Sequence, residues 1–197
     1  MSTCISRRDW LKLQSGTAGL LFISTTWPLA SPAQSLPAST TRPLDPSEVD
    51  GFLAIHPNGD VSVYCGKVDL GTGLRVAIPQ MVAEELGIGL QRIRFVEGDT
   101  GLTPDQGPTA GSTGIMRGGV QIRQAAATAR EALIALAAQR LGLPASALDT
   151  QGGAVVARAG GASVGFGELL GDQRFSLKLN PKAPLRDPAT YTVVGKP

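Results

Sequence analysis

Three kinds of residue are scarce in this sequence of 197 residues, and their scarcity limits its chemistry. His56 is the sole histidine, Cys4 and Cys65 are the two cysteines, and aromatic residues make up 5%. A zinc site or an iron–sulfur cluster needs several histidine or cysteine ligands. Any transition metal must therefore arrive inside a cofactor or on a partner. Cys65 ends an apolar run, which favours a buried small side chain over a reactive thiol.

An excess of charge and a long apolar run are also missing. The formal net charge is +2, but three of the 18 basic residues and one of the 16 acidic residues lie within residues 1–33, so the charges of the remainder balance. This balance gives no basis for binding nucleic acid or an anionic membrane surface. The apolar run at residues 18–23 is far shorter than the ~20 residues that span a bilayer. We therefore expect no transmembrane segment.

The N-terminal region carries the most specific local motif. Residues 6–12, SRRDWLK, match the twin-arginine pattern S-R-R-x-F-L-K with Trp10 in place of Phe. The apolar run follows, and Ser31-Pro32-Ala33 supplies small residues suited to cleavage. The alternative is a chance Arg-Arg pair before an apolar patch. We expect a twin-arginine signal peptide over residues 1–33, periplasmic localisation, and a linker rich in Pro, Ser and Thr over residues 34–48.

The order of the predicted elements indicates an α+β fold. Two β runs, residues 52–56 and 61–65, flank the turn sequence at residues 57–60 and predict a hairpin. A helix, a strand at residues 93–97 and a long helix over residues 116–141, regular from Val120, follow. We expect a hairpin and mixed sheet packed against these two helices. The side of the long helix predicted to be buried consists of Val120, Ala127, Leu133 or Ile134, Ala137 and Leu141.

The last part of the sequence predicts smaller elements. These are a hairpin around residues 151–153, a strand leading into a short helix at residues 164–170, and an exposed edge strand at residues 175–179. We expect one domain over residues 49–179. The Pro-rich tail, residues 180–197, has no closing element, and we expect it to lead to a C-terminal part that this chain does not include.

The sequence Gly71-Thr72-Gly73 precedes the first helix. Glycines on both sides of a polar residue let the backbone approach a ligand, and a helix start offers unpaired N–H groups to an anion. The alternative is a plain tight turn. Pro79 requires the helix either to begin late, near Ile78, or to kink. The helical face predicted to be apolar consists of Leu74, Ile78, Met81, Val82 and Leu86, and Glu84 and Glu85 fall mostly off it.

A second glycine-rich stretch, residues 98–114, is long for a loop in a small domain. Loops of this length are functional or disordered. Residues 109–114, TAGSTG, are suited to presenting N–H and hydroxyl donors to a polar ligand, the alternative being a flexible surface loop. We interpret Asp99 and Asp105 as turn formers. His56 is expected at a solvated loop edge, with catalysis as the other possibility.

Several of these segments together resemble one family. Residues 66–74, GKVDLGTGL, resemble the G-x-x-E-M-G-Q-G-L segment of molybdenum hydroxylase large subunits, the xanthine dehydrogenase/aldehyde oxidase family. Residues 82–87 resemble its A-E-E-L-G helix. Residues 99–104 and 108–112 resemble its D-T-x-x-x-P and P-T-A-A-S sequences. The leader and the tail are similar to those of exported members of the isoquinoline 1-oxidoreductase and nicotinate dehydrogenase type.

The resemblance implies a molybdopterin-binding domain and a set of contacts. In the family, the Gln of the G-Q-G turn donates a hydrogen bond to an oxo ligand of molybdenum, and Thr72 stands at that position here. The P-T-A-A-S loop lines the pterin site. By this resemblance we predict that the two stretches face one cleft and that the cofactor-binding residues are Gly71, Thr72, Gly73, Ala110, Gly111, Ser112 and Thr113.

The resemblance also implies a reaction and partners. The family hydroxylates or dehydrogenates an aldehyde or N-heterocycle, and its catalytic Glu lies in a G-x-G-E motif near the end of the full chain. That motif does not occur here, so we assign no catalytic residue and no metal ligand. We expect a molybdenum-molybdopterin cofactor and no iron–sulfur cluster on this chain. The expected partners are a small [2Fe–2S] subunit, the remaining part of the large subunit and a cytochrome electron acceptor.

Two other functions stay open from the sequence. A truncated remnant or a small exported interaction protein with the same fold would have no catalytic role. A periplasmic module for another anion would use the same glycine turn but leave the loop at residues 108–112 unexplained. The reading frame past codon 197 distinguishes the remnant from the enzyme.

Overall fold

The structure, a computed structural model, describes residues 44–171 and 176–195. The expected signal peptide, residues 34–43 of the expected linker, and Phe175 lie outside these ranges. The described residues belong to one unit, Thr41–Pro197. Within the described ranges, no helix combines the length and the apolar character that crossing a membrane requires.

A three-stranded sheet contains the predicted hairpin and the predicted third strand. β1 (Leu53–Ile55) runs antiparallel to β2 (Val61–Cys65), and β2 runs parallel to β3 (Ile93–Glu97), with β2 in the centre. The mixed sheet is therefore confirmed. Because β2 has a neighbour on each edge, four of its five residues are buried. One boundary differs, since Phe52 ends the helical turn α3 (Val49–Phe52) instead of starting the first strand.

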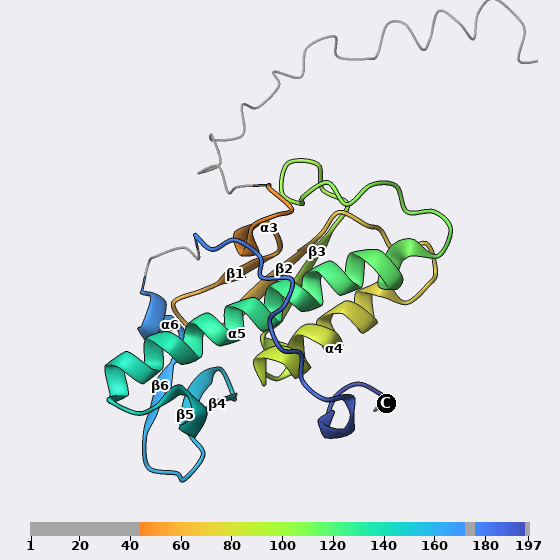
Figure 1. The fold of residues 1–197 in the computed structure, drawn as a ribbon. Coiled ribbons are helices and arrows are strands. Elements are labelled where there is room, and N and C mark those ends of the chain that lie inside the picture. The colour runs from red at the N-terminus through yellow and green to blue at the C-terminus, as the bar shows by residue number, and fades with distance from the viewer. Residues whose placement is uncertain (1–43, 172–175, 196–197) are drawn as a thin grey trace, which may run out of the picture. The chain divides into compact units, whose positions relative to one another are not determined.

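Two helices pack side by side over this sheet (Figure 1). α4 (Leu74–Leu86) connects β2 to the short 3₁₀-helix η1 (Leu90–Arg92) and β3. α5 (Val120–Leu141) follows a π-helical turn, η2 (Gly114–Gly119). Both α4 and α5 end at a glycine in the left-handed region, as is common at helix C-termini. The two predicted helices are thus confirmed, with the predicted start of regular helix at Val120.

The predicted apolar face of α4 is mostly confirmed. The helix begins at Leu74, immediately after Gly73, so a late start near Ile78 is wrong. Pro79 is buried inside the helix, where it cannot donate a backbone hydrogen bond. Met81 is half-buried. The fully buried members of the face are Leu74, Ile78, Val82 and Leu86.

The inward face of α5 is rotated relative to the prediction. Val120 was expected to be buried but is 55% exposed, and Ile122 is fully buried in its place. The helical hydrophobic periodicity is weak here because alanines make up eight of the 22 residues of α5. These short side chains allow α4 and the sheet to approach closely. The buried alanines are Ala125, Ala126, Ala127, Ala129 and Ala137.

A second sheet lies at the C-terminal end of α5 (Figure 1). After the 3₁₀-helix η3 (Ala145–Ala147), β4 (Leu148–Gln151), β5 (Ala154–Ala157) and β6 (Ser163–Gly165) form an antiparallel sheet, and α6 (Phe166–Leu170) follows. The predicted hairpin and strand–helix are confirmed. A Cβ on Gly167 would lie 1.8 Å from the carbonyl oxygen of Pro57, so only glycine allows α6 to pack against the first hairpin.

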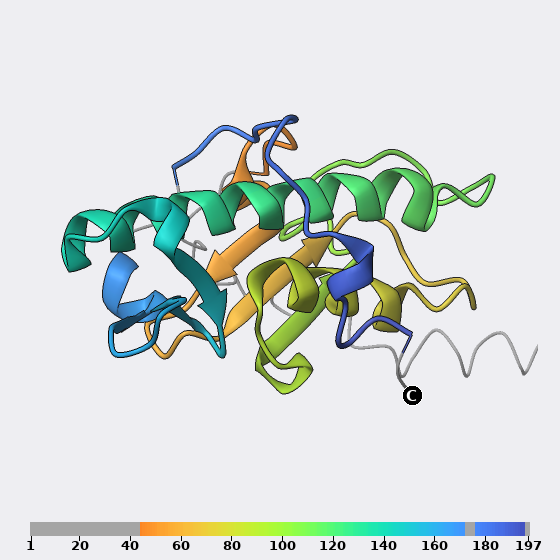
Figure 2. The same ribbon diagram turned by 60° about the horizontal axis from the view of Figure 1, so that its bottom comes forward.

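The C-terminal segment crosses α5 and continues along α4 (Figure 2), and it contains the 3₁₀-helix η4 (Pro188–Thr190). The predicted edge strand is wrong for its described part, residues 176–179. There the chain forms a single antiparallel bridge between Glu48 and Lys178. On α5, Arg130 donates a hydrogen bond to the carbonyl oxygen of Pro184, which ties the segment to the helix pair.

This segment explains why α4 is buried on two sides. The sequence pattern placed Glu84 and Glu85 off the apolar face, yet Glu84 is 6% exposed and Glu85 is fully buried. One oxygen of Glu84 accepts hydrogen bonds from three consecutive N–H groups, those of residues 192–194. Glu85 accepts hydrogen bonds from the N–H of Arg186 and forms ion pairs with Arg123 and Arg130.

Candidate functional site

The glycine turn before α4 folds around the side chain of Asp69. Its Oδ1 atom accepts hydrogen bonds from the N–H groups of Gly71 (2.8 Å), Thr72 (2.8 Å) and Gly73 (3.1 Å), and its Oδ2 atom accepts one from Arg75 (3.2 Å). Gly71 and Gly73 have φ angles of +90° and +80°, which glycine adopts without steric cost. The carboxylate therefore lies at the positive end of the α4 dipole.

This arrangement corrects the role expected for the turn. Its N–H groups were predicted to be free for an external anion, but they already bind Asp69. Hydrogen bonding lowers the pKa of the Asp69 carboxyl from its ordinary value of 3.8, with the N–H of Arg75 as the largest cause, followed by those of the turn. The turn still offers the exposed Thr72 and open space, because a Cβ on Gly71 or Gly73 would meet no atom within 4 Å.

The chain leaving β2 binds the second glycine-rich loop through alternate backbone N–H groups. The N–H of Gly66 donates to Oε1 of Gln106 (2.9 Å), and the N–H of Val68 donates to Oγ1 of Thr109 (3.0 Å). The amide nitrogen of Gln106 donates in turn to the carbonyl oxygen of Gly118 in η2 (3.2 Å). The loop is thereby held between the end of β2 and the start of the long helix.

Lys67 lies between these two contacts and points inward. Its side chain is buried, and its Nζ donates to the carbonyl oxygens of Gly107 (3.2 Å) and Pro108 (2.7 Å) and lies 3.5 Å from Oγ1 of Thr113. A Cβ on Gly118 would lie 2.8 Å from Cγ of Lys67. The glycine in η2 therefore makes room for the lysine stem.

Residues 110–112 present backbone N–H groups outward. The N–H and the hydroxyl of Thr113 both donate to the carbonyl oxygen of Ala110, at 3.1 and 2.7 Å, and close the loop. Gly111 and Ser112 have φ angles of +56° and +58°, a conformation that costs a non-glycine residue roughly 1–2 kcal/mol. In the described part of the chain, no atom accepts a hydrogen bond from the N–H of Ala110, Gly111 or Ser112, and all three residues are exposed.

The turn and the loop lie at the same end of the helix pair, at the N-termini of α4 and α5 (Figure 1). Gly114, which follows Thr113, contacts Leu74, which follows Gly73: a Cβ on Gly114 would lie 3.0 Å from the leucine side chain. The structure thus brings all seven predicted site residues to one end of α4 and α5. That they bind one cofactor together stays a prediction.

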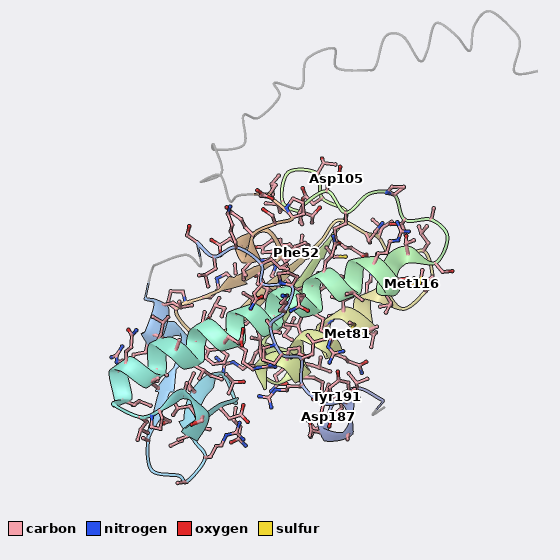
Figure 3. All side chains as sticks on the ribbon, in the orientation of Figure 1. Phe52, Met81, Asp105, Met116, Asp187 and Tyr191 are labelled. Atoms are coloured by element: carbon pink, nitrogen blue, oxygen red, sulfur yellow. The ribbon has the colours of Figure 1, made fainter. Side chains whose placement is uncertain are left out.

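Exposed apolar side chains share this end of the molecule. Five of the nine large apolar side chains that are exposed in the described chain belong to the turn, to the first residues of α4 or α5, or to η2. Met116, 63% exposed, is labelled at this end in Figure 3. Clustered apolar side chains of this size indicate contact with another protein surface or a ligand. Besides Met116, the exposed apolar side chains at this end are Leu70, Val76, Ile115 and Val120.

Sequence reasoning missed the side chains that organise these loops: Lys67, Asp69 and Gln106. For Asp69 a signal existed, since an Asp two residues before a glycine commonly accepts that N–H in a turn. For Lys67 no signal existed, because a lysine that follows a strand is ordinarily exposed. Gln106 gave no signal because its partners, the N–H of Gly66 and the carbonyl oxygen of Gly118, are distant in the sequence.

The remaining candidate residues are structural. His56 is exposed and its Nε2 is hydrogen-bonded to Oγ of Ser62 (2.8 Å). Cys65 is fully buried, and burial raises the pKa of its thiol to about 11, as expected for a core cysteine. Asp99 and Asp105 each accept a backbone N–H two residues ahead, as predicted for turn formers. Over residues 44–171 and 176–195, no group of three or more His, Cys, Asp or Glu side chains could hold a metal ion.

Comparison with known proteins identifies the family. The family model described as molybdopterin cofactor-binding domain matches residues 8–194. The chain belongs to this family. Its cofactor class is therefore molybdopterin with molybdenum.

Two relatives of this family are similar over most of the chain. A nicotinate dehydrogenase subunit of Pseudomonas putida is 35% identical over 192 residues, which are 98% of this chain and 16% of that protein. The beta subunit of isoquinoline 1-oxidoreductase of Brevundimonas diminuta is 30% identical over 173 residues, which are 84% of this chain and 22% of that protein. The chain thus spans less than a quarter of the length of either relative.

Solved structures agree with this assignment. CO dehydrogenase from Oligotropha carboxidovorans superposes with a TM-score of 0.53 and 26% identity over 60% of this chain and 15% of that chain. Quinoline 2-oxidoreductase from Pseudomonas putida superposes with a TM-score of 0.50 and 25% identity over 59% of this chain and 15% of that chain. The mixed arrangement of small sheets and helices is therefore shared with these two enzymes.

The residues of the loop fit an anionic pterin cofactor. The exposed N–H groups of residues 110–112 are donors in need of acceptors, and φ changes sign between Ser112 (+58°) and Thr113 (−78°). Exposed backbone N–H groups without an acceptor in the chain can donate to an anion. The N–H groups of the glycine turn already donate to Asp69. The turn can therefore contribute to a cofactor site only the Thr72 side chain and a close approach of its backbone.

Proposed function

We propose that this chain forms the N-terminal part of the large subunit of a molybdopterin-dependent oxidoreductase. Its role there is to contribute cofactor-binding loops. The observation that carries the proposal is the row of exposed, unfilled N–H groups at residues 110–112, next to the glycine turn and in a member of the molybdopterin cofactor-binding family. Backbone donors of this kind bind an anion without the conformational freedom of long side chains.

Within such a site, the residues of this chain have different roles. Ala110, Gly111 and Ser112 donate hydrogen bonds to the anionic part of the cofactor. Gly71 and Gly73 let the backbone come close to it, and the Thr72 hydroxyl faces it from the turn. When bound, the cofactor supplies the redox chemistry, and the chain's own residues hold and orient it. The catalytic base lies outside the described residues.

The proposed reaction is hydroxylation or dehydrogenation of an aldehyde or N-heterocycle. It is supported by relatives whose names include nicotinate dehydrogenase and isoquinoline 1-oxidoreductase, although each is similar over only 16–22% of its own length. A relative named membrane-bound aldehyde dehydrogenase (pyrroloquinoline-quinone) from Gluconacetobacter polyoxogenes is 26% identical over 97% of this chain. The substrate would be selected by parts of the enzyme beyond these residues.

The proposed partners are the remaining part of the large subunit and a small [2Fe–2S] subunit. Support comes from the names of the two relatives, each of which is described as one subunit of its enzyme, and from the apolar side chains exposed around the loops. A cytochrome as the final electron acceptor stays a prediction from the resemblance. Export by the twin-arginine route to the periplasm is likewise proposed from residues 6–12 alone.

The decisive experiment is molybdenum and pterin analysis of the native assembly. The chain should be purified from its own cells together with the products of neighbouring genes. Molybdenum is measured by mass spectrometry of the metal, and the pterin by fluorescence of its oxidised product. We expect both in stoichiometric amounts. An exported, intact assembly without either would contradict the proposal and favour a remnant that binds no cofactor.

A further inference from the structure

Lys67 has an unusual environment for a lysine. Its side chain is 2% exposed, and its ammonium group contacts two carbonyl oxygens and one hydroxyl oxygen. Of the carboxylates in the described part of the chain, none forms an ion pair with it. Burying an ammonium costs several kcal/mol unless partners compensate. The neutral oxygens satisfy its N–H bonds but leave its positive charge uncancelled.

The contacts of Lys67 fix which way the loop faces. In a trans peptide unit, the C=O and the N–H point in opposite directions. The carbonyl of Pro108 points to Nζ of Lys67, so the N–H of Thr109 points away from the lysine. The carbonyl of Ala110 is likewise held by Thr113, so the N–H of Gly111 points away from Thr113. The N–H groups of Thr109 and Gly111 are thereby turned away from Lys67 and Thr113.

We propose that Lys67 is a positioning residue for the cofactor loop. It holds the carbonyl of Pro108 directly and that of Ala110 through Thr113, so that the N–H groups of Thr109 and Gly111 face the anionic cofactor. Its unpaired charge strengthens binding from behind the loop. The inference rests on the proposed function, because the anion in question is the cofactor. No side-chain contact between Lys67 and the cofactor is required, so it is not a catalytic residue.

The test compares Lys67→Met with Lys67→Arg in the native assembly. Met keeps the stem that packs against Gly118 and removes the charge and the hydrogen bonds. One readout is the molybdopterin retained after extended gel filtration. The other is hydrogen–deuterium exchange of residues 107–113. For Lys67→Met we expect at least about tenfold lower retention, as for loss of a buried charged partner, and faster exchange confined to this loop. Lys67→Arg should retain more cofactor than Lys67→Met.

A matched control removes a cation that holds backbone carbonyls elsewhere. Arg92 donates to the carbonyl oxygens of Asn58 and Gly152, each at 2.7 Å, in the turn regions of the two hairpins. Arg92→Met should lower stability without changing exchange in residues 107–113 or cofactor retention. If Arg92→Met and Lys67→Met lose cofactor equally, the effect is general destabilisation and the inference is wrong. Should Lys67→Met not fold, Lys67→Gln, which still donates one hydrogen bond, replaces it with the same expectations.

Failure of this inference can be told apart from failure of the proposed function. If the unaltered assembly holds molybdopterin and Lys67→Met holds it equally firmly, the role of Lys67 is refuted and the function stands. If the unaltered assembly holds none, both are refuted together.

Discussion

The turn at residues 71–73 and the loop at residues 110–112 differ in how their rows of backbone N–H groups are satisfied. In the turn, one carboxylate of the chain, Asp69, accepts all three N–H groups and that of Arg75. In the loop, residues 110–112 donate to no described atom. Both stretches are glycine-rich, exposed and at the same end of α4 and α5. Glycine content therefore does not show whether the backbone N–H groups of such a stretch are already bonded to the chain's own acceptors.

The difference lies in the residue that precedes each row. Asp69 stands two positions before Gly71, the first residue of its row, and its side chain reaches the turn; Pro108, at the same offset from Ala110, has no acceptor in its side chain. A third row of N–H groups, at residues 192–194, is also bonded to a carboxylate of the chain. Its acceptor is Glu84 of α4, which is distant in the sequence. The chain thus fills two rows with its own carboxylates, and the row at residues 110–112 has no acceptor in the described part of the chain.

The largest effect is expected where a carboxylate of the chain is fully buried. Glu85 pairs with Arg123 and Arg130 and accepts the N–H of Arg186, so Glu85→Ala leaves buried charges unpaired. We expect the free energy of unfolding to fall by about 3–5 kcal/mol. Urea denaturation followed by circular dichroism measures it. The control is Glu168→Ala, which breaks an exposed pair with Arg140 and should cost at most about 1 kcal/mol. Equal losses would show that burial of the pair is unimportant.

A carboxylate placed in the open loop should make it resemble the turn. Ala110→Asp puts an acceptor at the same offset from Ser112 that Asp69 has from Gly71. We expect the new side chain to accept the N–H of Ser112 and to repel the anionic cofactor, lowering molybdenum per assembly by about tenfold, with the fold preserved. Ala110→Asn has nearly the same shape without the charge and should lose less. Unchanged molybdenum in Ala110→Asp would mean that the loop does not bind the cofactor's anionic part.

The smallest effect concerns the protonation of Asp69. The pKa of its carboxyl is lowered in the folded chain, first by the N–H of Arg75 and then by the N–H groups of the turn. Its contribution to stability is therefore complete above the ordinary pKa of 3.8 and is lost as the pH falls through the lowered value. The amide proton shifts of Gly71 and Thr72, followed by NMR, should titrate with a midpoint below 3.8. In Asp69→Asn this titration should vanish, and a midpoint at or above 3.8 would refute the assigned hydrogen bonds.

Local patterns predicted most elements because those elements depend on near neighbours. The strand at residues 93–97 and the regular helix from Val120 follow from apolar periodicity and helix-forming residues. Errors arose where a distant segment intervened. Glu84 and Glu85 read as surface residues on α4, but the C-terminal segment, about a hundred positions away, covers them. Val120 lies at the exposed end where the loops leave the helix pair.

The sequence by itself determined the elements, their order, and the family resemblance carried by residues 66–74 and 108–112. These rest on local conformational preference and on motif spacing, which require no knowledge of long-range contacts. The tertiary structure alone decided which N–H groups are free. A backbone donor is available to a ligand only if no acceptor of the chain reaches it. Asp69 reaches its donors locally, but Glu84 reaches those of residues 192–194 only because segments about a hundred positions apart pack together.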